Sequence, residues 1–178
     1  SFPTRRSSNL RMKQFALHSL NTSTSSSRRY HIEGSVESVL YNANLAKFFP
    51  GVVIVEGAPD VWRTHLLNSY NISSVGLLSK GFNRERARIC ATLWGYCHNW
   101  GCIMLDSPQK DPHTPKEAQK IAAMLLEEGA FPAGIFISTL PQEDPDSYDP
   151  DGLLYYIRNS TYVPNSQRDI GVTDELED

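Results

Sequence analysis

Several kinds of sequence feature are scarce or missing in this chain of 178 residues. No apolar stretch approaches the roughly 20 residues that a membrane-spanning helix needs, so we expect a soluble protein without a membrane partner. Only three cysteines occur, Cys90, Cys97 and Cys102, and their spacing with His98 matches no zinc-binding pattern. We therefore expect buried thiols in a reducing compartment rather than a metal site.

Acidic residues are missing from the first part of the chain and concentrated in the last part. Residues 1–32 hold six basic residues and no acid, whereas residues 141–178 hold ten acids and two bases. The first part is also rich in Ser and Thr, so we predict a disordered basic tail there. Two origins remain open: an organelle transit segment starting at Met12, or an artefact, because residues 2–10 resemble a translated sequencing adapter. We favour the artefact.

The length suits one domain of ordinary size with tails. We divide the chain into the basic tail, a lead-in segment over 33–50, a folded domain over 51–158 and an acidic tail over 159–178. The first residue is not Met, and we expect this chain to be one part of a larger enzyme. A net charge of −3 and a pI near 5.9 do not by themselves indicate nucleic-acid binding.

Short apolar runs alternate with helical patterns in the folded part. The runs are 52–55, 74–78, 102–105 and 135–137, and the predicted helices extend over 59–70, from 83 through 94, and from 114 to a stop at 129. Glycine, proline and capping residues separate these elements. Strands that alternate with helices imply right-handed crossovers. The sequence therefore predicts an α/β fold, a four-stranded parallel sheet with helices on both faces.

Carboxylates follow two of the predicted strands. Glu56 comes directly after the run 52–55, and Asp106 follows the run 102–105, in a loop that also carries Asp111. The carboxyl ends of parallel strands meet at one edge of a sheet, so Glu56 and Asp106 are expected to face the same pocket. Clustered carboxylates are unfavourable unless a cation lies between them, and hard oxygen ligands suit Mg²⁺ or Mn²⁺. This pattern is typical of phosphoryl transfer.

Several motifs resemble a known family. They are Val-Ile-Val-Glu-Gly-x-x-Asp at 53–60, Leu-Asp at 105–106, Leu-Pro at 140–141 with Glu-Asp-Pro-Asp at 143–146, and the lead-in Val-Leu-Tyr-Asn-Ala-Asn-Leu-Ala-Lys at 39–47. Together they resemble the Toprim domain of bacterial-type DNA primases and of phage and mitochondrial primase-helicases. The motif at 140–146 separates primases from the topoisomerases and nucleases of the superfamily. The resemblance covers about residues 39–157 and implies a Toprim, Rossmann-like fold.

The resemblance implies a role for each acidic residue. Glu56 would be the catalytic acid or base, or a metal ligand, and Asp106 with Asp111 would hold Mg²⁺ or Mn²⁺. Asp60 would cap the first helix or support the site. Asp144 and Asp146 would support the metal site or form a turn.

The implied reaction is metal-dependent nucleotidyl transfer for RNA primer synthesis on single-stranded DNA. The partners would be that template, nucleoside triphosphates, the RNA primer, and a replicative helicase or a helicase domain in the full-length chain. The location would be the cytoplasm of a bacterium or a phage-infected cell, or a mitochondrion or plastid if the N-terminal segment is genuine. Lys80, Arg84 and Arg88 form a basic cluster that could touch nucleic acid, although a solvated helix face explains them equally well.

Three departures from the family pattern keep other functions open. Pro108 stands where the family's Asp-x-Asp motif has its second Asp, Ser79 replaces the Gly that follows the second strand in primases, and Glu143 replaces a Lys and so reverses a charge. The chain also has neither a P-loop helicase motif nor a paired Cys/His zinc module, so unwinding and template reading are not encoded here. The alternatives are a Toprim-type nuclease or DNA-breaking domain, and a degenerate, non-catalytic nucleic-acid-binding domain.

Overall fold

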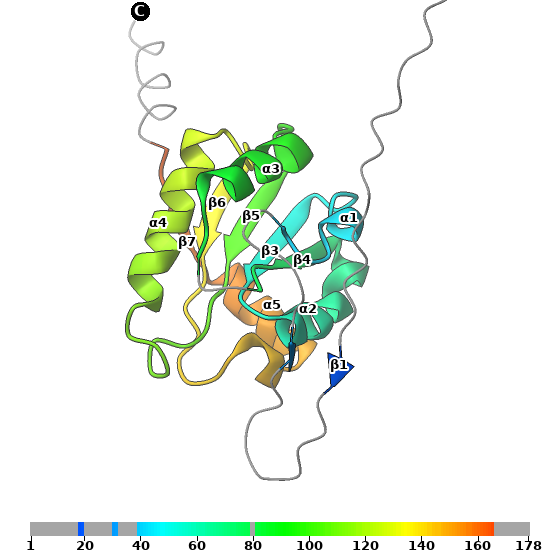
Figure 1. Cartoon of the computed structure of the whole chain (residues 1–178), viewed down its shortest axis with the longest axis vertical. Coiled ribbons are helices and arrows are strands. Elements are labelled where there is room, and N and C mark those ends of the chain that lie inside the picture. The colour runs from blue at the N-terminus through cyan, green and yellow to red at the C-terminus, as the bar shows by residue number, and fades with distance from the viewer. Residues whose placement is uncertain (1–17, 20–29, 32–38, 79–80, 166–178) are drawn as a thin grey trace, which may run out of the picture. The chain divides into compact units, whose positions relative to one another are not determined.

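The computed structural model describes residues 18–19, 30–31, 39–78 and 81–165 (Figure 1). The chain divides into two units, residues 1–35 and residues 36–178. In the first unit, β1 (His18–Ser19) pairs antiparallel with β2 (Tyr30–His31). These two short strands fall within the tail predicted to be disordered, and the rest of that tail lies outside the described residues. All other elements belong to the second unit.

A five-stranded sheet forms the centre of the second unit. Its strands are β3 (Gly51–Val55), β4 (Ile72–Gly76), β5 (Trp100–Ile103), β6 (Gly134–Ile137) and β7 (Thr161–Val163). They lie in the order β4-β3-β5-β6-β7, and the first four are parallel, as predicted. The fifth strand, β7, runs antiparallel to β6. Its Thr-Tyr-Val sequence favours a strand, and it lies in the segment that we predicted to be an acidic tail.

The boundaries of β4 and β5 lie two residues earlier than the apolar runs indicated. β4 begins at Ile72 because Asn71 adopts the left-handed conformation, with φ of 60°, and ends the helical segment before it. β5 begins at Trp100, whose N–H donates to the Pro50 carbonyl at 3.0 Å. Backbone pairing therefore begins each strand two residues before the apolar run that predicted it.

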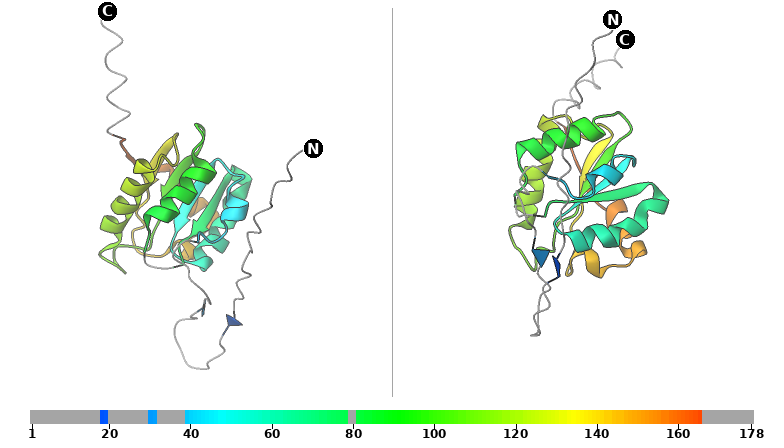
Figure 2. Two further views of the ribbon diagram at one scale, coloured as in Figure 1. Left: turned by 45° about the horizontal axis from the view of Figure 1, so that its top comes forward. Right: turned by 45° about the vertical axis from the view of Figure 1, so that its right-hand side comes forward.

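Helices cover both faces of the sheet (Figure 2). They are α1 (Ala43–Ala46), α2 (Ala58–Thr64), η1 (His65–Tyr70), α3 (Arg84–Trp94), α4 (Thr114–Glu127), η2 (Pro145–Ser147) and α5 (Pro150–Arg158). Successive residues of a strand point to opposite faces. Val52 and Ile54 of β3 therefore share a buried cluster with α3 and α4, whereas Val53 and Val55 pack with α2 and α5. All four side chains are fully buried.

Polar residues at helix starts set the helix boundaries. Asn83 precedes α3, and its side-chain oxygen accepts the Arg86 N–H at 2.9 Å. Asp149 precedes α5 and accepts the Gly152 N–H at 2.7 Å in the same way, which fits the stabilising effect of such caps. Helix α5 was not among our predicted elements. The helix predicted over 59–70 is an α-helix only in its first half and continues as η1, a 3₁₀ helix.

The lead-in segment lies along the outer edge of β4. Tyr41 and Gly76 exchange two backbone hydrogen bonds of 2.9 and 3.2 Å. The Asn42 side chain donates to the Ser74 carbonyl at 2.9 Å, and Leu40 is buried against the core. Residues 39–49 are therefore packed against the domain that we had predicted to begin at residue 51.

The expected burial of the cysteines is confirmed for two of the three. Cys90 and Cys102 are buried in the core, whereas Cys97 is exposed. The exception has a simple cause, because α3 ends at Trp94 and does not carry its buried face as far as residue 97. No group of three or more metal-ligating side chains forms around these thiols in the described part of the chain.

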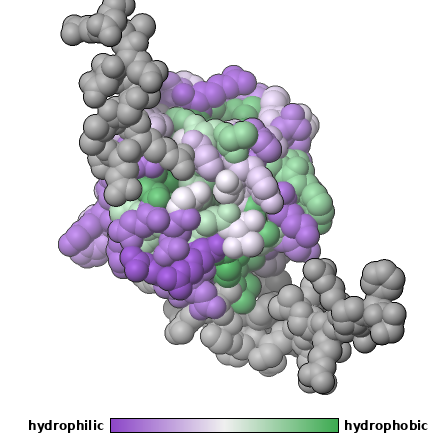
Figure 3. Space-filling view, turned by 90° about the horizontal axis from the view of Figure 1, so that it is seen from above, coloured by the Kyte–Doolittle hydropathy of each residue, from purple (hydrophilic) through white to green (hydrophobic). Residues whose placement is uncertain are grey.

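One face of the molecule is mixed in polarity. Figure 3 shows hydrophilic and hydrophobic residues interspersed over the face seen from above. Within the described ranges, no helix combines the length and the apolar content that a membrane span requires.

Candidate functional site

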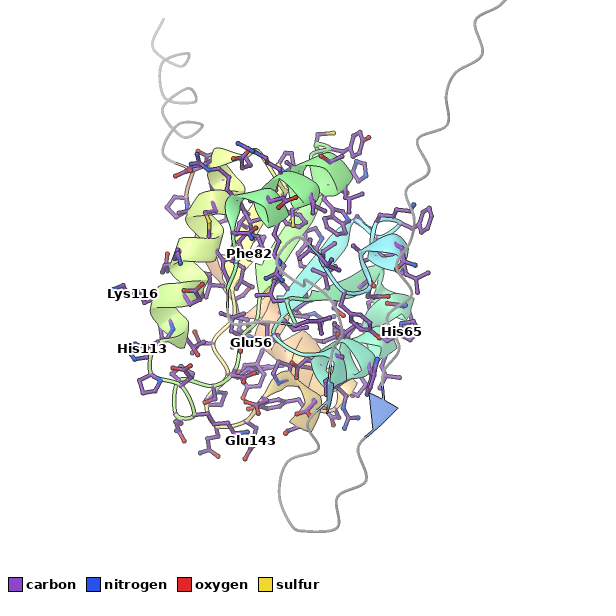
Figure 4. All side chains as sticks on the ribbon, viewed as in Figure 1. Glu56, His65, Phe82, His113, Lys116 and Glu143 are labelled. Atoms are coloured by element: carbon purple, nitrogen blue, oxygen red, sulfur yellow. The ribbon has the colours of Figure 1, made fainter. Side chains whose placement is uncertain are left out.

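Glu56 occupies the loop that leaves β3, next to the loop that leaves β5. β3 pairs directly with β5, and Ile54 lies opposite Ile103 in the register. The backbone N–H of Asp106 donates to Glu56 Oε1 at 3.2 Å. The prediction that these two loops meet at one edge of the sheet is therefore confirmed. In Figure 4, Glu56 lies near the centre of the molecule, and Glu143 lies farther out at the rim.

Asp106 is surrounded by other carboxylates. Burial is the main cause that raises its pKa from 3.8 to about 7, followed by the negative charges of Glu56, Asp144 and Asp60. The positive charge of Lys110 acts in the opposite direction. The Asp106 carboxyl group therefore keeps its proton to a higher pH than a free carboxyl group does, and a cation would stabilise its charged form.

Asp60 caps the start of α2, which is one of the two roles predicted for it. Its Oδ2 accepts the Gly57 N–H at 2.8 Å, so it caps the start of α2. It is only 5% exposed, and burial, with smaller contributions from Asp146 and Asp144, raises its pKa to about 6. The hydrogen bond from Gly57 lowers the pKa and only partly offsets the burial. Asp60 is thus a helix cap. It also belongs to a group of neighbouring carboxylates, the acidic cluster, which consists of Glu56, Asp60, Asp106 and Asp144.

The Asp-Pro-Asp motif forms a turn that faces the same cluster. Asp144 to Ser147 make a 3₁₀ turn, closed by a Ser147 N–H that donates to the Asp144 carbonyl at 3.0 Å. Arg63 Nε donates to the Asp146 carbonyl at 2.9 Å and attaches this turn to α2. Asp144 Oδ1 is buried and has no hydrogen-bond partner. Asp144 and Asp146 therefore form the turn and also add negative charge beside Asp60.

Asp111 and Glu56 line the same pocket, whereas Asp106 is not among its lining residues. This cavity of about 280 Å³ is lined by Glu56, Leu77, Leu105, Asp111, His113, Thr114 and Glu117. Asp111 Oδ1 accepts the N–H of His113 at 3.0 Å, at the start of α4. The Asp111 N–H donates to the Ser107 carbonyl at 3.1 Å, which closes a turn in the loop. This turn directs Asp111 toward α4.

The described residues do not assemble a three-ligand metal site. No group of three or more His, Cys, Asp or Glu side chains is close enough to hold one ion there. The predicted set of Glu56, Asp106 and Asp111 is therefore not formed. Two carboxylates remain, Glu56 and Asp106, and their chemistry fits Mg²⁺, which keeps several waters and needs only one or two protein carboxylates. Burial, followed by the negative charges of Glu56, Asp144 and Asp60, raises the pKa of Asp106, and a bound cation would oppose this rise.

The predicted basic cluster is largely engaged in ion pairs. Arg84 lies 2.6 Å from Glu127 and 3.3 Å from Glu128, and Arg88 lies 3.3 Å from Glu128. These pairs join α3 to α4. Lys80 lies outside the described residues. Because Arg84 and Arg88 are paired with glutamates of the α4 region, the structure adds no support for nucleic-acid contact by these two side chains.

Sequence reasoning missed several residues of the site. His113, Thr114 and Glu117 line the pocket beside Glu56, and the start of α4, which was predicted, was the available signal. Lys110 was also missed, although it follows Asp106 by four residues and is the only basic residue of that loop. A lysine so close to a candidate metal-binding aspartate would have been the signal.

Known structures share this architecture. No family model and no curated protein matches the sequence. A DNA primase domain from Pseudomonas aeruginosa matches with a TM-score of 0.60 at 18% identity, over 78% of this chain and 44% of that one. The zinc-binding and RNA polymerase domains of the Aquifex aeolicus primase match with a TM-score of 0.59 at 18% identity, over 80% of this chain and 36% of that one.

The chain has the fold of bacterial DNA primase domains. A third structure with this primase fold is the DnaG primase catalytic domain bound to single-stranded DNA, with a TM-score of 0.58 at 14% identity, over 75% of this chain and 44% of that one. The predicted resemblance to a primase-group Toprim domain, and the predicted fold class, agree with these matches. The chain spans between about a third and a half of the length of these primase structures.

Proposed function

We propose that this chain is the catalytic domain of a DNA primase or primase-helicase, which extends an RNA primer on single-stranded DNA. The observation that carries the proposal is the acidic cluster around Glu56 and Asp106, at the carboxyl ends of two adjacent parallel strands of a primase fold. Ligand sites of open α/β sheets lie at this edge. A similar structure, the DnaG catalytic domain, is bound to single-stranded DNA.

The chain's own residues divide the work of nucleotidyl transfer. Glu56 and Asp106 would hold one Mg²⁺ or Mn²⁺, which when bound neutralises the charge of the triphosphate and stabilises the attacking and leaving oxygens. In the transfer, the 3′ oxygen of the primer forms a bond to the α-phosphorus while the bond to pyrophosphate breaks. Glu56 would accept the proton of the 3′ hydroxyl. Asp60, which is buried and hydrogen-bonded to Gly57, would keep the Glu56 loop in place.

The partners follow from this reaction. They would be a single-stranded DNA template, nucleoside triphosphates and the growing RNA primer. A replicative helicase, or a helicase domain elsewhere in the protein, would supply the template strand. The pocket of about 280 Å³ that Glu56 and the start of α4 line would hold part of a nucleotide.

Primer synthesis in the protein that contains this chain tests the proposal. The substitution Glu56→Gln keeps the size of the side chain and removes its charge, and we expect it to lower primer synthesis by at least about 100-fold, as is usual for a residue in acid–base or metal chemistry. Glu85→Gln, on the exposed side of α3, is the matched control and should leave the rate unchanged. A Glu56→Gln protein with full activity would refute the assignment. Nicking of supercoiled plasmid without primer synthesis would indicate the nuclease alternative instead.

One observation favours a second candidate, a non-catalytic nucleic-acid-binding domain. No three-ligand group exists among the described residues, and Pro108 cannot act as a ligand. Calorimetric titration of Mn²⁺ into the wild-type chain and into Glu56→Gln separates the two. Binding that is lost in the variant supports the catalytic domain, and negligible heat in both supports the non-catalytic one.

A further inference from the structure

Lys110 forms ion pairs with two acidic residues, Glu143 and Asp144. It belongs to the loop between β5 and α4, and its Nζ lies 2.6 Å from Asp144 Oδ2 and 3.3 Å from Glu143 Oε2. Glu143 and Asp144 belong to the segment that leads into η2. The pair therefore joins two loops that leave neighbouring strands of the sheet, β5 and β6.

The position of Lys110 is set by a hydrogen-bonded turn. Ser107 is fully buried, and its carbonyl accepts the N–H of Lys110 at 2.9 Å and the N–H of Asp111 at 3.1 Å. The Ser107 hydroxyl also accepts the Gln109 N–H at 3.2 Å. This turn places the backbone of Lys110 where its side chain can reach the segment that leads into η2. The contact therefore depends on the backbone as well as on the rotamer of Lys110.

Lys110 supplies positive charge where the other groups are negative. Glu56, Asp144 and Asp60 all disfavour the charged form of Asp106, and Lys110 favours it. One oxygen of Asp144 contacts Lys110, and the other, Oδ1, is buried without a hydrogen-bond partner. Only one of the two carboxylate oxygens of Asp144 therefore contacts the ammonium group of Lys110.

We propose that Lys110 is a built-in counter-cation that competes with the divalent ion for the acidic cluster. The inference rests on the proposed metal site at Glu56 and Asp106. When no divalent ion is bound, the ammonium group offsets part of the negative charge and occupies Asp144. The same ammonium group repels a divalent ion that binds, so ion binding and the pairing of Lys110 with Asp144 oppose each other. Divalent-cation affinity is therefore set below the value that the carboxylates alone would give.

The Lys110–Asp144 ion pair is partly exposed, so it can break when a divalent ion binds. The side chains of Lys110 and Asp144 are 45% and 25% exposed, and exposed ion pairs contribute little to folding. Removing the charge of Lys110 should therefore leave the fold intact and change mainly the electrostatic potential at the cluster. Lys116, which lies on the outer side of α4 (Figure 4), offers a control of the same residue type.

Calorimetric titration of Mn²⁺ into metal-free protein tests the inference. Lys110→Met removes the charge, and we expect it to raise the Mn²⁺ affinity by about tenfold, the order expected when a unit charge near a divalent ion is removed in partly hydrated surroundings. Lys110→Arg keeps the charge and should bind Mn²⁺ about as the wild type does. Lys116→Met should show no change. Unchanged or weaker binding by Lys110→Met would overturn the inference.

The failure of this inference can be distinguished from failure of the proposed function. If the wild type binds Mn²⁺ and Lys110→Met does not bind it more tightly, the metal site stands and the competition is refuted. If neither protein binds Mn²⁺, both are refuted. Thermal unfolding in EDTA checks that each variant is folded. Should Lys110→Met not fold, Lys110→Gln, which keeps hydrogen-bond donors but no charge, provides the same comparison.

Discussion

Replacing Asp106 by Asn should stabilise the metal-free protein and remove its response to metal. Burial and neighbouring carboxylates raise the pKa of Asp106 from 3.8 to about 7, so the charged form is disfavoured in the folded state. A difference of about three in pKa would correspond to roughly 4 kcal/mol if the group were fully buried. Asp106 is only half-buried, and solvent screening reduces this to about 1–2 kcal/mol. Asp106→Asn should therefore gain about 1–2 kcal/mol at pH 8.

The sign of the pH dependence follows from the same shift. The folded-state pKa of Asp106 lies above the unfolded value of about 3.9, so the folded protein binds more protons than the unfolded chain between about pH 4 and pH 7. The contribution of this group to stability therefore rises as the pH falls through that window. The advantage of Asp106→Asn should be largest at pH 8 and should shrink toward pH 5.

Urea denaturation in EDTA at pH 5 and pH 8 measures both effects. A saturating divalent ion should reverse the order at pH 8, because an ion at 100 times its Kd stabilises the wild type by about 2.7 kcal/mol and the variant has lost a ligand. Asp106→Asn that is less stable than wild type in EDTA at pH 8, or equally affected at both pH values, would refute the reasoning. Unfolding in a metal-free buffer keeps the electrostatic effect separate from ligand binding.

Two further predictions concern the packing and the ion pairs. Gly101→Ala in β5 should destabilise the domain by about 1–3 kcal/mol, because the added Cβ would lie 2.7 Å from Phe131 Cδ2. Chemical denaturation measures this loss of stability. The control is Gly81→Ala, whose added Cβ would meet no atom within 4 Å. Removing both Arg84 and Arg88 should weaken binding to a single-stranded DNA oligonucleotide by less than about threefold, since their charges are paired with α4; fluorescence anisotropy showing a larger loss, with a salt slope reduced by about one per residue, would identify phosphate contacts.

The fold was largely predictable because its main signals are local. The run Val52 to Val55 has no polar residue, which indicates a strand covered on both faces, and the structure buries all of it. Pro and capping residues marked the helix starts at Pro59, Asn83 and Thr114. Helix α5 has comparable signals in Asp149 and the proline that follows it. They come directly after the Asp-Pro-Asp motif, which is typical of a turn, and so the helix was not predicted.

The acidic site was only partly predictable because loop conformations decide it. The meeting of Glu56 with Asp106 followed from the rule that strand ends share one edge of a parallel sheet. The position of Asp111 depends instead on the turn at Ser107, whose hydrogen bonds direct it toward α4. The contact of Lys110 depends on where the segment after β6 passes, which no local pattern specifies.

The lead-in segment protects the sheet from pairing with other chains. β4 is an edge strand, and an unpaired edge is a template for aggregation. Tyr41 and Asn42 occupy backbone groups of Gly76 and Ser74 along that edge. At the opposite edge β7 has only three residues, too short to pair with a long strand. We expect a truncated form that began at Gly51 to expose the edge of β4 and to self-associate.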